Sequence, residues 1–197
     1  GNPGKNPSPV LRTTSWQSGA PDLALPMASP HTLPAGTRED VHSFSLETGL
    51  DRDSWIRSID LLPGTPSMVR SALISIRGGA VLATWVPGHD VIPTPSGTAF
   101  HLPAGAILDL KISYKKHWRD EATDQTDLST LGLYLTDPPL SGRSIETLSL
   151  APANNANDQN TVTLKLSASV RLLALRPQLD QVYDSITVSA VSPTARE

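Results

Sequence analysis

The chain has 197 residues, no cysteine and a formal net charge of -3, and hydrophobic residues make up 38% of it. A chain without cysteine has no disulfides, no thiol catalysis and no thiolate metal sites. With 16 basic against 19 acidic residues, it lacks the concentrated basic field that nucleic-acid binding requires. Its apolar runs are shorter than the roughly 18 residues of a membrane helix. We therefore expect no transmembrane segment here, and any export signal or anchor to lie upstream of Gly1.

Residues 1–37 contain seven of the 18 prolines and are predicted to form an extended N-terminal arm. Proline removes amide donors and fixes φ, which excludes a helix or a central strand. Val10 and Leu11 are candidate contacts with a neighbouring protein chain. Trp16 either pins the arm onto the chain's own sandwich, which we favour, or contacts a partner. Residues 38–197 are predicted to form one domain.

Short apolar runs separated by Gly and Pro predict strands from about residue 40 onward. They cover residues 41–46, 55–62, 68–76, 80–86, 108–114, 131–135, 162–170 and 185–191. The run 108–114 alternates with a period of two, as a strand with one buried face does. The run 162–170 alternates in the same way, and its apolar residues are expected to face the same core. The fold class is therefore all-β, an antiparallel β-sandwich of jelly-roll type.

The order of several short motifs adds a family resemblance. They are Trp16–Leu23, Gly78–Gly88, Leu102–Gly105 and Leu131–Tyr134. In this order they resemble the copper type II, ascorbate-dependent monooxygenases, the family of the peptidylglycine hydroxylating enzymes, and especially its bacterial relatives. The resemblance implies a β-sandwich.

The same resemblance argues against the family's activity. Histidine ligands of the two coppers are expected at six positions. The chain carries other residues there: Arg70, Ser71, Ser113, Lys115, Gln178 and Asp180. Arginine and lysine would also repel a cation. We therefore expect a degenerate relative with no copper, no other cofactor and no catalytic residue.

Other metal chemistry finds little support in the residue spacing. No two of the five histidines lie within four residues of each other. His89 and His101, which flank one loop, are the favoured pair. Ordinary hydrogen bonds explain both better than a metal does. The acidic residues between Asp120 and Asp127 offer oxygen ligands, but without the spacing of a known calcium loop. A solvated acidic loop is the favoured interpretation.

The most basic stretch of the chain is residues 114–119, which also holds two aromatic side chains. Tryptophan, tyrosine and arginine are enriched in protein interfaces. The candidate partner contacts in it are Tyr114, Lys115, Lys116, Trp118 and Arg119. The alternative is a strand end that runs into a solvated loop, and the sequence leaves both open.

These observations predict a non-catalytic accessory or structural subunit that acts through contacts with other protein subunits and binds no nucleic acid. We expect it in the periplasm or outside the cell, in a membrane-associated complex. The family context suggests photosynthetic or respiratory electron transfer. Two alternatives stay open: a copper-dependent monooxygenase with relocated ligands, and a ligand-binding β-sandwich module.

Overall fold

The computed structural model describes residues 15–139, 144–148, 165, 170–175 and 185–189. The chain divides into two units between residues 149 and 150, a boundary inside the range predicted as one domain. The strands of the described residues all lie in the first unit. They are β1 (Leu23–Pro26), β2 (His31–Leu33), β3 (Glu39–Glu47), β4 (Ser54–Leu62), β5 (Val69–Ile76), β6 (Val81–Trp85), β7 (Phe100–Leu102), β8 (Ile107–Lys115), β9 (Gln125–Asp127) and β10 (Thr130–Thr136), with the 3-10 helix η1 (Trp118–Asp120) before β9.

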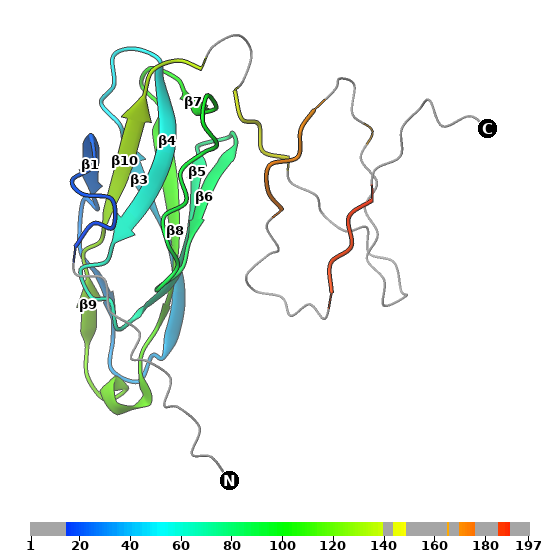
Figure 1. Ribbon diagram of the computed structural model, residues 1–197. Coiled ribbons are helices and arrows are strands. Elements are labelled where there is room, and N and C mark those ends of the chain that lie inside the picture. The colour runs from blue at the N-terminus through cyan, green and yellow to red at the C-terminus, as the bar shows by residue number, and fades with distance from the viewer. Residues whose placement is uncertain (1–14, 140–143, 149–164, 166–169, 176–184, 190–197) are drawn as a thin grey trace. The chain divides into compact units, whose positions relative to one another are not determined.

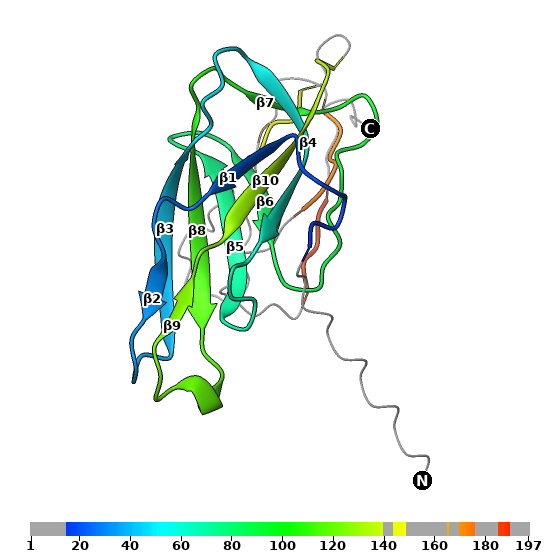
Figure 2. The ribbon, with the colours of Figure 1, turned by 90° about the vertical axis from the view of Figure 1, so that its left-hand side faces the viewer.

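The strands form two antiparallel sheets that pack as a sandwich (Figure 1). One sheet has the order β1-β10-β4-β7 and the other the order β3-β8-β5-β6. A two-stranded ribbon of β2 and β9 lies beside one end of β3 (Figure 2). The predicted all-β class and antiparallel sandwich are confirmed.

The centre of the second sheet is β8, which pairs with β3 on one side and β5 on the other. Its residues Leu108, Leu110 and Ile112 are fully buried, whereas Lys111 between them is exposed. This is the alternation that the sequence predicted for residues 108–114. A tight turn at Gly78 joins β5 to β6, and its φ of 67° is one that glycine adopts without steric cost.

The segment from Trp16 onward belongs to the sandwich. Gly132 of β10 leaves room for the Trp16 ring, because a Cβ at Gly132 would lie 2.7 Å from a ring carbon. The Gln17 amide donates to the buried Asp60 carboxylate at 3.2 Å, and Tyr134 donates to the Gly19 carbonyl at 2.7 Å. Trp16 therefore pins this segment to its own sandwich, as favoured.

Two strands, β1 and β2, also lie within the range predicted as an arm, and each pairs antiparallel with a later strand. Only residues 1–14 of that range, which include Val10 and Leu11, lie outside the described residues. The prediction of an extended arm is therefore wrong for β1 and β2, which belong to paired strands. The partner contact expected of Val10 and Leu11 stays a prediction.

Predicted strands in the second unit fall partly on described residues. Residues 170–175 and 185–189 form no strand, and Val170 is 64% exposed. The prediction of a strand at 185–191 is therefore wrong for residues 185–189. Ile186 and Val188 are exposed, whereas a strand is stabilised by the packing of its side chains against neighbours. Val162, Leu164 and Leu166 lie outside the described residues.

Candidate protein-contact site at the tip of the sandwich

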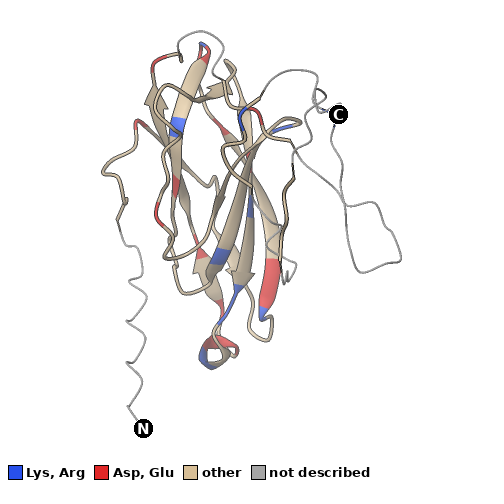
Figure 3. Cartoon of the chain, turned by 45° about the vertical axis from the view of Figure 1, so that its right-hand side comes forward, with Lys and Arg blue, Asp and Glu red and all other residues tan. Residues whose placement is uncertain are grey.

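Two connecting segments meet at one end of the first unit. The segment after β2 and the loop between β8 and β9 lie side by side there (Figures 1 and 2), joined by a hydrogen bond from the Gly36 amide to the Glu121 carbonyl at 2.8 Å. We call residues 34–39 and 115–124 the tip. Basic and acidic residues occur together on η1 (Figure 3). The tip contains four of the eight residues predicted to contact a partner: Lys115, Lys116, Trp118 and Arg119. A fifth, Tyr114, directly precedes it in β8.

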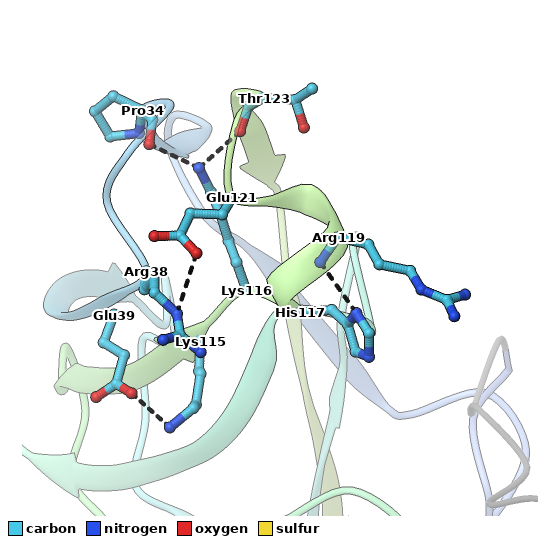
Figure 4. A network of polar contacts seen from close by, with 9 residues as sticks. All are labelled: Pro34, Arg38, Glu39, Lys115, Lys116, His117, Arg119, Glu121 and Thr123. Carbon is cyan, nitrogen blue, oxygen red and sulfur yellow. Dashed lines mark hydrogen bonds and ion pairs between the residues drawn. The ribbon is translucent and has the colours of Figure 1, made fainter.

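Lys116 holds the two segments of the tip together. Its side chain is only 2% exposed, and its ammonium group donates to the carbonyls of Pro34 and Thr123, both at 2.7 Å (Figure 4). A buried ammonium group is costly unless it is hydrogen-bonded, so this arrangement fixes the loops around it. The prediction that Lys116 contacts a partner is wrong, because the side chain faces the interior.

Two ion pairs lie on the surface of the tip. Arg38 lies 3.6 Å from Glu121, and Lys115 pairs with Glu39 (Figure 4). The hydrogen bond from Lys115 lowers the pKa of the Glu39 carboxyl. Both pairs are exposed, so each contributes little to stability. Lys115 lies on the surface as predicted, but its charge already has a partner within the chain.

Trp118 and Arg119 are both exposed on η1. Trp118 is 64% exposed, and the Arg119 guanidinium lies 5.1 Å from the centre of its ring. The His117 Nδ1 atom accepts a hydrogen bond from the Arg119 amide at 3.3 Å and caps η1 (Figure 4). The structure therefore presents a tryptophan and an arginine together to solvent, two residue types that are enriched among the residues that dominate binding at interfaces.

Tyr114 belongs to the interior and not to the contact surface. It is 2% exposed, and its hydroxyl donates to the Asp127 carboxylate at 3.1 Å. Asp127 also accepts hydrogen bonds from the Ser129 hydroxyl and the Thr65 amide, both at 2.7 Å. The prediction of Tyr114 as a partner contact is therefore wrong. Its side chain instead ties the end of β8 to β9, directly below the tip.

Burial raises the pKa of Tyr114 above its ordinary value, and the Asp127 and Asp40 carboxylates raise it further. The folded protein thus keeps the phenol proton at a pH where the unfolded chain loses it. We expect the free energy of unfolding to fall as pH rises above about 10. Tyr114→Phe should reduce this alkaline loss, while costing about 1.5–3 kcal/mol at neutral pH through the lost hydrogen bond to a charged group. Urea unfolding of both proteins at pH 7, 9 and 10.5 measures the effect, and equal slopes would contradict it.

The sequence favoured His89 and His101 as the histidine pair, but the fold brings His31 and His42 together instead. His101 lies 2.9 Å from the Asp53 carboxylate and against Trp55, an ordinary surface contact as favoured. The rings of His31 and His42 are the ones that stack, with centroids 4.4 Å apart. The register of β2 with β9 and of β3 with β8 brings them together, and no local spacing signals it.

The acidic residues between 120 and 127 do not gather at one point. Asp127 is buried beneath Tyr114, Glu121 pairs with Arg38, and Asp124 accepts a hydrogen bond from the Ala35 amide at 2.7 Å. Each of the three is directed to a different partner. This is the physical reason that the loop offers no shared oxygen cage for calcium.

The positions aligned with copper ligands can be placed in part. Ser71 on β5 lies opposite Ser113 on β8, with Arg70 and Lys115 exposed nearby, while Gln178 and Asp180 lie outside the described residues. Comparisons of the chain with protein-family models, with curated proteins and with solved structures find no match. The monooxygenase resemblance therefore remains a proposal. Within the described residues, no helix has the length and apolar character needed to cross a membrane.

Proposed function

We propose that this protein is a non-catalytic subunit that binds another protein through the tip, with Trp118 and Arg119 as the central contacts. The observation that carries the proposal is the exposure of Trp118 on a short helix whose loop is fixed by a buried lysine. Full burial of a large apolar side chain contributes about 1.5–3 kcal/mol. A partner that covers this ring gains that contribution.

The fixed geometry of the tip favours binding over a merely solvated loop. Ordering a loop at an interface costs free energy, and a loop that is already ordered avoids that cost. Lys116 and the hydrogen bond from the Gly36 amide to the Glu121 carbonyl hold the loop that carries η1 in place before any partner arrives. The sequence left both interpretations open, and this bracing favours the contact surface.

The exposed chemistry also defines the partner. The Trp118 ring fits an apolar pocket, and the planar Arg119 guanidinium fits a carboxylate at the pocket's rim, which it can bind through two parallel hydrogen bonds. We therefore expect a protein partner with an apolar hollow bordered by Asp or Glu. A location in the periplasm or outside the cell, within a membrane-associated photosynthetic or respiratory complex, rests on the family resemblance alone.

Four versions of the protein, expressed in the native source and purified under mild conditions, test this proposal. Wild type and Ile92→Ala should retain the same stoichiometric protein partner, because Ile92 is an exposed apolar residue in a different loop. Trp118→Ala should weaken binding by about 2 kcal/mol or more, roughly thirtyfold in Kd. Lys116→Met keeps the buried volume but loses the hydrogen bonds to the Pro34 and Thr123 carbonyls. It should therefore weaken binding although Trp118 is unchanged, because the loop that carries Trp118 is no longer fixed.

The affinity for the partner identified in this way is then measured by calorimetry with each purified variant. Unfolding curves show whether Trp118→Ala is folded, which its exposed position predicts. A folded Trp118→Ala protein that binds the partner as tightly as wild type would contradict the proposal.

A further inference from the structure

We infer that His31, Asp40 and His42 form a binding site for a divalent transition-metal ion of the Zn²⁺ class. The three residues come from β2 and β3, and their ligand atoms all lie within 4.8 Å of one another. Two imidazoles and one carboxylate are a ligand set that proteins use for Zn²⁺ with a further position left for water. This site is separate from the positions aligned with copper ligands.

The topology explains why these residues meet. Asp40 and His42 alternate along β3 and lie opposite Tyr114 and Ile112 of β8, whose side chains are buried. They therefore face the inner side of the sheet, at its edge. His31 enters from the neighbouring ribbon, where it lies opposite Asp127 of β9.

His31 is the fixed member of the set. Its side chain is 14% exposed, and its ring stacks on the Tyr114 ring with centroids 4.9 Å apart. Tyr114 is itself held by its hydrogen bond to Asp127. Support of this kind behind a ligand fixes the orientation of its ring and so strengthens metal binding.

The distances suit a small ion. The His31 Nε2 and Asp40 Oδ2 atoms are 2.9 Å apart, whereas two ligand atoms about 2.1 Å from a tetrahedral Zn²⁺ lie roughly 3.4 Å apart. A metal would thus replace this hydrogen bond after a small separation of the two groups. His42 is exposed, so its ring can turn toward the ion without disturbing the core.

The electrostatic surroundings also favour a cation. Besides Asp40, a second carboxylate lies close to His31: Asp127 is opposite His31 in the ribbon of β2 and β9 and accepts the Tyr114 hydrogen bond at 3.1 Å. The two basic side chains nearest in sequence to Asp40 and Tyr114, Arg38 and Lys115, each pair with a carboxylate of their own. Their charges are therefore partly neutralised near the proposed site.

Calorimetric titration of the whole chain with Zn²⁺ tests the inference, with the His42→Ala and His101→Ala variants as a matched pair. Both histidines are exposed or nearly so, and His101 also lies 2.9 Å from an aspartate but without a second histidine. Loss of a supporting residue alone costs about 10–100-fold in metal affinity, so His42→Ala should weaken binding at least tenfold. His101→Ala should bind like wild type.

Thermal unfolding gives an independent reading. Zn²⁺ should raise the Tm of wild type and of His101→Ala, because a ligand that binds only the folded state stabilises it, and should leave the Tm of His42→Ala nearly unchanged. In chelator all three should unfold at similar temperatures. Wild type without stoichiometric Zn²⁺ binding, or binding of equal strength in His42→Ala, would overturn the inference and leave a hydrogen-bonded pair or an adventitious ion only.

Discussion

Leu110→Ala should lower the free energy of unfolding by about 2–5 kcal/mol. Leu110 is fully buried at the centre of β8, where it lies opposite Phe44 of β3 and Ile74 of β5. The truncation removes apolar contacts on both sides, and paired strands leave little freedom for the cavity to collapse. Equilibrium denaturation in urea measures the change.

The neighbouring residue is the control for this prediction. Lys111 follows Leu110 on the same strand but is exposed, so Lys111→Ala should change stability by less than about 0.5 kcal/mol. The two substitutions share strand and hydrogen-bond ladder and differ in the face that they occupy. Equal destabilisation by both would mean that the register of β8 is wrong.

We expect the second large loss of stability from a substitution of Asp127, whose carboxylate is buried. Asp127→Ala should cost about 3–5 kcal/mol, because each buried donor left without a partner costs about 1–3 kcal/mol. Three donors lose their acceptor: the Tyr114 and Ser129 hydroxyls and the Thr65 amide. The loss should also loosen the tip, since Tyr114 anchors the strand end that leads into it.

Asp51→Ala is the comparison for the carboxylate, since Asp51 is exposed in the loop before β4. It should change the urea midpoint little, whereas Asp127→Ala should shift it strongly at pH 7. Ser129→Ala should shift the urea midpoint less than Asp127→Ala does, because it removes only one of the three hydrogen bonds. A midpoint for Asp127→Ala close to that of Asp51→Ala would contradict the network.

The longer strands were predictable because they carry a physical signal. In β8 the period of two selects which side chains the sheet buries, and Gly78 marks the turn between β5 and β6. The three-residue strands β2, β7 and β9 were not predicted. They are too short for a period to show, and they exist because a neighbouring strand supplies their hydrogen bonds.

The candidate site was half predictable. Trp118 and Arg119 stand out as exposed contact chemistry, and the structure leaves both exposed. Tyr114 and Lys116 were misjudged, although the signal was present: continuing the alternation of Leu110 and Ile112 by two more steps puts both on the buried face. The cluster of His31 with His42 depends on the pairing of distant strands, which no local pattern encodes.

The most direct test of the binding role is hydroxyl-radical footprinting of Trp118 in protein isolated gently from its native source. We predict that Trp118 is protected in that sample and labelled rapidly after the protein is separated from its partner, while Ile92 is labelled equally in both. If Trp118 is labelled equally fast in both samples, the tip is not where this protein meets its partner.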